Sequence, residues 1–191
     1  MNATRRFVVH TLSILFGLSA WIAINGLWQQ TPILVNQLPE GWSLASYITL
    51  ITQLANIGPI IYSTLRRYFG SQNLDRYSIH AIYLIGVISI IFLVFFWNAT
   101  SIIGGVRHST TFFALIFLLA IVDCTSSVLY APYMATIAAP TFLVSHLVGQ
   151  SLSGLIPSFL ALAQGVGGNP ECVNSTDGSD TLKPHFPPPH F

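Results

Sequence analysis

The sequence predicts an all-α polytopic membrane protein, and its composition and hydropathy are the first two observations that lead to this fold class. Hydrophobic residues make up 52% of the 191 residues, charged residues make up only 7%, and the mean hydropathy is +0.65. A soluble globular domain carries about 25% charged residues. A chain with so few charges cannot cover a surface in water, so we expect a lipid bilayer to be its solvent.

The third observation is a series of long apolar stretches, because a transmembrane helix needs about 20 predominantly apolar residues. Five such stretches cover residues 7–28, 43–65, 79–97, 111–134 and 142–164. Arg5 and Arg6 before the first stretch also fit a signal peptide, but this stretch is longer than a typical signal core. Residues 165–191 are polar and contain a run of three prolines, so we expect a largely disordered tail.

Several classes of protein are excluded by what the sequence lacks. A net charge of +1 argues against a nucleic-acid-binding protein, which needs a basic patch. Two cysteines, Cys124 and Cys172, are too few for a disulfide-dense scaffold. The motifs CxxC, HExxH, GxSxG and GxxxxGK[ST] are all missing from the sequence. We therefore expect no metal, no cofactor and no enzymatic activity.

The orientation in the membrane follows from the basic residues in the connections, which favour the cytoplasmic side. Only Arg107 and Lys183 fall outside if residues 1–6 are cytoplasmic. The other five basic residues then lie inside; they are Arg5, Arg6, Arg66, Arg67 and Arg76. This orientation places the tail outside the cell, together with two N-glycosylation acceptor sequences at Asn98 and Asn174.

Polar side chains form stripes on four of the five predicted spans, because residues at i, i+3, i+4 and i+7 share a helix face. The stripe on the fourth span holds Asp123, Ser126, Ser127 and Tyr130. The stripes on the first, second and fifth spans hold Trp21, Asn25 and Trp28, then Gln53 and Asn56, then His146, Gln150 and Ser153. Membrane helices turn such residues away from lipid, so these four spans are expected to surround one polar space.

Asp123 is the most informative of these residues, since an aspartate at the centre of a span costs about 2.5–3.5 kcal/mol to insert. It is expected to face a cavity or a partner, or to bond to nearby serines or helix backbone. The amides and hydroxyls on the other spans also fit simple helix association, and Trp28 fits an interfacial belt. Asp123, Ser127 and His146 also form a conceivable catalytic set, but a triad is defined by its geometry, for which the sequence gives no support.

Three ordered segments carry a resemblance to a known family. They are WIAINGLWQQTPILVNQLPEGWSLASYITLITQLANIGP at residues 21–59, FLLAIVDCTSSVLYAPYM at residues 117–134 and VGQSLSGLIPSFLALAQG at residues 148–165. In order and spacing these segments resemble the riboflavin transporter family, solute carrier family 52. The resemblance implies a plasma-membrane protein that takes up riboflavin by alternating access. It also implies about eleven spans, of which this chain would supply about half.

The resemblance also implies roles for the polar stripes. The flat ring of riboflavin would stack on Trp21 and Trp28. Its ring edge and polyhydroxyl tail need hydrogen-bond donors and acceptors, which are offered by Asn25, Gln53, Asn56, Asp123 and Ser126. A ligand with little net charge needs no strong countercharge, which is consistent with one acid in the middle of the membrane.

The chain departs from the family pattern at two positions and in its length. Gln30 and Gln150 stand where relatives are expected to carry acids. The sequence ends within what would be the long loop before the second set of helices, so we expect a fragment or a truncated form. Its expected partners are lipid, riboflavin, and the second helix bundle or a full-length copy. The alternative is a regulatory membrane protein without transport activity that pairs with a full-length transporter.

Overall fold

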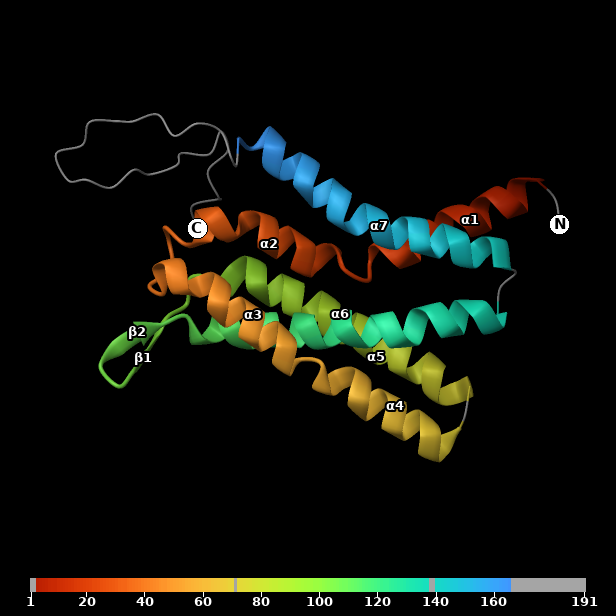
Figure 1. Ribbon diagram of the computed structural model, residues 1–191, viewed down its shortest axis with the longest axis horizontal. Coiled ribbons are helices and arrows are strands. Elements are labelled where there is room, and N and C mark those ends of the chain that lie inside the picture. The colour runs from red at the N-terminus through yellow and green to blue at the C-terminus, as the bar shows by residue number, and fades with distance from the viewer. Residues whose placement is uncertain (1–2, 71, 138–139, 166–191) are drawn as a thin grey trace.

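The structure, a computed structural model, describes residues 3–70, 72–137 and 140–165. Helices dominate this part of the chain (Figure 1). The helices are α1 (Ala3–Leu18), α2 (Ile22–Leu34), the 3₁₀ turn η1 (Gly41–Ser43), α3 (Leu44–Leu54), α4 (Ile57–Phe69), α5 (Gln72–Phe96), α6 (Thr110–Ile137) and α7 (Pro140–Ala163). Segments long and apolar enough to cross a membrane are Gly41–Phe69, Asn73–Phe96, Thr110–Ala135 and Thr141–Ala163. The bent pair α1 and α2 adds a fifth segment, and the expected all-α membrane fold is confirmed.

The first predicted span is a broken helix rather than a straight one. The axes of α1 and α2 meet at 48°, and α2 continues past the expected end at residue 28 to Leu34. At the break, the hydroxyl of Ser19 donates to the Phe16 carbonyl at 2.8 Å. A side chain bonded to the backbone in this way competes with the regular helix ladder, which accounts for a break without glycine or proline.

Two further elements differ from the expected pattern. The second span is divided at Ala55 and Asn56 into α3 and α4. The connection after α5, for which the sequence predicted no element, contains a β-hairpin with β1 (Ser101–Ile103) antiparallel to β2 (Val106–His108). Its turn residues Gly104 and Gly105 have φ angles of 61° and 83°, which glycine adopts without steric cost. A Gly-Gly pair between short apolar runs was the available signal for this hairpin.

Helix α6 is the central element and packs against α2, α3, α4, α5 and α7. Apolar side chains at its start, including Phe112, Ile116 and Leu119, are buried in the main core cluster. Helices α1 and α7 pack against each other through glycines. A Cβ atom on Gly17 would overlap the carbonyl of His146, and one on Gly149 would overlap the carbonyl of Ile14. The two backbones are therefore in direct contact where they cross.

The connections gather at opposite ends of the bundle (Figure 1). The start of α1, the end of α4, the start of α5, the end of α6 and the start of α7 lie at one end. The α2–α3 connection and the hairpin lie at the other end. Five arginines belong to the first of these ends by their sequence position, namely Arg5, Arg6, Arg66, Arg67 and Arg76.

Candidate functional site

Asp123 lies beside the break between α1 and α2, where it caps the second helix. The first turn of a helix has backbone N–H groups without partners inside the helix. Trp21, the residue before α2, offers no side-chain cap. The backbone N–H of Ile24 in this first turn instead donates to the Asp123 carboxylate from α6. The side chain is almost fully buried, with 2% of the residue exposed, and the positive end of the α2 dipole favours an anion there.

The two serines that follow Asp123 bind the same break. The Ser126 hydroxyl is fully buried and donates to the Asp123 carbonyl at 2.7 Å, with a longer contact of 3.5 Å to the Ala20 carbonyl. The Ser127 hydroxyl accepts from the Trp21 indole Nε1 at 2.9 Å. The α6 stripe predicted from helical spacing thus faces the point where the first span changes direction.

Hydrogen bonds between α2 and α7 continue from the break toward the hairpin end. Asn25 Nδ2 donates to Ser153 Oγ at 3.1 Å, and Gln29 Nε2 donates to Ser158 Oγ at 3.1 Å. Gln30 Nε2 donates to Gln164 Oε1 at 2.6 Å. We call these six residues the α2–α7 ladder. Sequence reasoning missed Gln29 because the first span was ended at residue 28; its spacing of four from Asn25 was the available signal.

The other predicted site residues lie apart from this group. Trp28 lies on α2 and is 37% exposed. Gln53 and Asn56 are exposed at the division between α3 and α4, where Asn56 Nδ2 donates to Gln53 Oε1 at 3.3 Å. In the part of the chain that the structure describes, no hydrogen bond joins these two amides to α2, α6 or α7. The structure therefore brings together Trp21, Asn25, Asp123 and Ser126, and leaves Gln53 and Asn56 on a separate surface.

His146 belongs to an aromatic cluster on the α1 side of the break rather than to a catalytic set. Its ring lies 5.4 Å from Phe16 and 6.3 Å from Tyr130, while Phe16 and Tyr130 stack at 4.3 Å. Ser127 is bonded to Trp21 instead of to His146. The described residues contain no group of three or more His, Cys, Asp or Glu side chains that could hold a metal ion.

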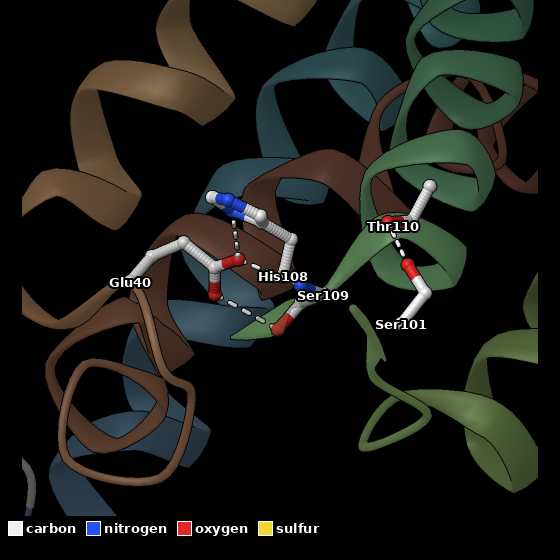
Figure 2. Close-up of polar contacts among 5 residues, drawn as sticks. All are labelled: Glu40, Ser101, His108, Ser109 and Thr110. Atoms are coloured by element: carbon white, nitrogen blue, oxygen red, sulfur yellow. Dashed lines mark hydrogen bonds and ion pairs between the residues drawn. The ribbon is translucent and has the colours of Figure 1, made fainter. Parts of the chain in front are cut away.

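A second polar cluster holds the connections at the hairpin end together (Figure 2). One carboxylate oxygen of Glu40 accepts from the Ser109 backbone N–H at 2.6 Å, and the other accepts from the Ser109 hydroxyl at 2.8 Å. His108 Nδ1 lies 3.7 Å from the same carboxylate. Because Ser109 immediately precedes α6, Glu40 fixes the α2–α3 connection to the start of the central helix.

Of the two predicted glycosylation sites, only Asn98 lies in the described residues. It is exposed, two positions after the end of α5. Asn174 and the tail at residues 166–191 lie outside the described residues, so the prediction of disorder there is not addressed.

Comparison with known proteins places these features in a family. The model of the solute carrier family 52 riboflavin transporters matches residues 5–191. Riboflavin transporter member 3-A of Danio rerio is 45% identical over 174 residues, which cover 91% of this chain and 38% of the relative. Member 3 of Bos taurus is 44% identical over 180 residues, covering 93% and 38%, and member 2 of Homo sapiens is 37% identical over 178 residues, covering 91% and 39%. No solved structure matches the chain.

The matched relatives are therefore much longer than the chain, which spans less than two fifths of their length. The family model covers residues 5–191, a range that includes the broken first helix and Asp123. The family is one of solute carriers and not of enzymes. The chain is thus a multi-pass membrane protein that belongs to solute carrier family 52, the riboflavin transporters.

Proposed function

We propose that this chain supplies one helix bundle of a riboflavin transporter in the plasma membrane. The observation that carries this proposal is the break in the first span, surrounded by polar groups of α2, α6 and α7. Discontinuous helices in transporters are found at substrate sites near the middle of the membrane, where they line a cavity. The names of the relatives supply the identity of the substrate, which is riboflavin.

The side chains at the break and on α2 have two different roles in this proposal. Trp28, Trp21 and Asn25 contact the ligand, with the indoles stacking on its ring and the amide bonding to its polar atoms. Ser126 acts through α2, and Asp123 does so through one of its carboxylate oxygens, because both residues are buried and bonded to the break. The second carboxylate oxygen of Asp123 has no hydrogen-bond partner in the described residues, which leaves an acceptor for a ligand hydroxyl.

Gln53 and Asn56 are assigned to the same transport path, although they lie on a surface separate from the break. Exposed amides within a membrane span are unfavourable against lipid. They therefore face the second helix bundle, or the aqueous cavity between the two bundles. Transport by alternating access would then move this bundle against the other around the shared site. The N-terminus is cytoplasmic in this arrangement, since five arginines gather at its end of the bundle.

A chimera tests the proposal. Residues 1–165 of this chain replace the matching segment of the Danio rerio relative, and uptake of labelled riboflavin into cells is measured against empty cells. We expect saturable riboflavin uptake by the chimera and none by the chain alone in reconstituted vesicles. A chimera that reaches the cell surface without taking up riboflavin would contradict the proposal.

Substitution of a tryptophan tests the assignment of the ring site. In the chimera, Trp28→Ala should raise the KM for riboflavin about three- to tenfold, because one aromatic stacking contact is lost. The control is Trp42→Ala, since Trp42 is 87% exposed and lies outside the proposed site. Equal KM values for the two variants at equal surface levels would place Trp28 in the interfacial belt instead.

A further inference from the structure

The α2–α7 ladder has hydrogen-bonding capacity that its own contacts do not use. A carboxamide has two N–H donors and a carbonyl acceptor. Asn25 and Gln29 each use one N–H within the described residues, toward Ser153 and Ser158. The two serine hydroxyls meanwhile donate to carbonyls of their own helix, at 2.6 Å to Gln150 and 2.8 Å to Gly154. Each of these two rungs thus leaves one donor and one acceptor of the amide without a partner among the residues that the structure describes.

The ladder is also accessible at its edge. Asn25, Gln29, Gln30, Ser158 and Gln164 are all partly exposed, whereas Ser153 at the break is buried. These residues belong to the outer half of the broken span and to the last turns of α7. Unused amide groups at that depth are costly against lipid. Association of two helices accounts for the bonds across the ladder, but it leaves the unused groups without water or a partner.

The spacing of the rungs gives them a repeat. Asn25 and Gln29 are four residues apart on α2, a rise of about 6 Å. Their partners Ser153 and Ser158 are five residues apart on α7, a rise of about 7.5 Å. The rungs therefore follow one another from Trp21 and the Asp123 cap toward the hairpin end, and each amide offers both a donor and an acceptor.

We infer that the α2–α7 ladder is the subsite for a polyhydroxyl chain. Successive hydroxyls of such a ligand bond to the unused amide groups of Asn25 and Gln29, while a flat ring attached to the chain lies against the Trp21 indole at the break. The inference rests on the proposed function and deepens it, because it assigns the sugar-like tail of the substrate to residues on two particular helices. It also makes the ladder the element that selects flavins with a hydroxylated chain.

Cysteine labelling of the full chain in intact cells tests whether the ladder faces water. In a Cys172→Ser background, Ser158→Cys should react with a membrane-impermeant thiol reagent added from outside. Leu160→Cys is the control, because Leu160 is 59% exposed but belongs to an apolar surface. Failure of Ser158→Cys to react beyond the level of Leu160→Cys would overturn the inference.

Protection of that cysteine tests the ligand. Riboflavin should slow the labelling of Ser158→Cys, and an alloxazine without the hydroxylated chain should not. Added Gln29→Leu should weaken the protection by riboflavin about tenfold, because it removes bonds to the chain. The matched Gln37→Leu, beyond α2 and exposed, should leave protection unchanged. Equal protection by the two ligands, no protection by riboflavin, or no effect of Gln29→Leu would each overturn the inference.

The two proposals fail in different ways. If the chimera takes up riboflavin while Ser158→Cys is unprotected, the ladder is only a contact between helices and the proposed transport function stands. If the chimera reaches the surface and takes up no riboflavin, the proposed function fails, whatever the labelling shows.

Discussion

At the scale of single residues, Asp123 shows how a carboxylate is accommodated inside a membrane bundle. Its position in the middle of an apolar span suggests a ligand contact, and the structure gives it a partner that sequence spacing does not reveal. That partner is the Ile24 backbone N–H at the start of α2. Capping groups usually come from the residue just before the helix. Here Trp21 occupies that place, and the cap comes from another helix.

The capping role predicts a difference between two substitutions of Asp123. Asp123→Asn keeps an acceptor for Ile24, and asparagine is as good a cap as aspartate. Asp123→Leu leaves that N–H unsatisfied, with an expected loss of about 1–3 kcal/mol of stability. Thermal unfolding of the purified chain in detergent should therefore show a lower Tm for the leucine variant only. In the chimera, Asp123→Asn should retain riboflavin uptake; strong loss of uptake at a normal surface level would assign the charge to the ligand instead.

At the scale of helices, close packing of α1 on α7 fixes the N-terminal half of the broken span. Gly17 and Gly149 allow the two backbones to touch, as small residues do at helix contacts in membranes. Above this contact the break lets α2 diverge by 48° while the ladder still holds it to α7. Both halves of the first span are therefore held to α7, α1 by direct contact of the backbones and α2 by hydrogen bonds between side chains.

A pair of glycine substitutions tests this contact. Gly149→Ala places a methyl group on the Ile14 carbonyl and should destabilise the chain by about 1–3 kcal/mol through overpacking. Gly26→Ala is the matched control on α2, because a Cβ there meets nothing within 4 Å. It should be neutral, or stabilising by about 0.5–1 kcal/mol, since alanine favours helix over glycine. Equal unfolding temperatures for the two variants would show that α1 and α7 separate readily.

The apolar pattern predicted where the helices lie, whereas the break in the first span came only with the structure. Hydropathy identified five spans because length and composition suffice for that purpose. The break at residues 19–21 has no glycine or proline, so it left no signal in the sequence. It depends on the bond of Ser19 to its own helix and on the contacts that Asp123 and Ser126 of α6 make with Ile24 and Ala20. Helical spacing likewise predicted that Asp123, Ser126 and Ser127 share one face of α6. It did not predict the hydrogen bond between Ser127 and Trp21, because that bond depends on how two helices pack.

At the scale of the whole molecule, the bundle has two chemically different ends. Five arginines gather at the end that holds the start of α1, the end of α4 and the start of α5. At this end Tyr62 donates to Asp75 at 2.6 Å, and Arg66 pairs with Asp75 at 3.2 Å. The opposite end carries the hairpin and the Glu40 cluster. Basic residues near the ends of spans set the orientation of a membrane protein during insertion, so this asymmetry determines which end is cytoplasmic.

The asymmetry predicts the orientation of the chain in the plasma membrane. An epitope tag at the N-terminus should be inaccessible to antibody in intact cells and accessible after permeabilisation. A tag inserted between Gly104 and Gly105 of the hairpin should be accessible in both. The opposite pattern would place the arginines outside and contradict the predicted topology.

The contact between Glu40 and Ser109 has a mechanical consequence for the proposed movement of this bundle against the second bundle. One carboxylate accepts hydrogen bonds from both the backbone N–H and the hydroxyl of Ser109, the residue before α6. The connection that leads into α3 therefore cannot shift without displacing the start of the central helix. A force applied to the connections at the hairpin end is therefore shared between the first, second and fourth spans. We therefore expect the hairpin end of the bundle to move as one unit, with the bend of the first span at residues 19–21 lying outside that unit.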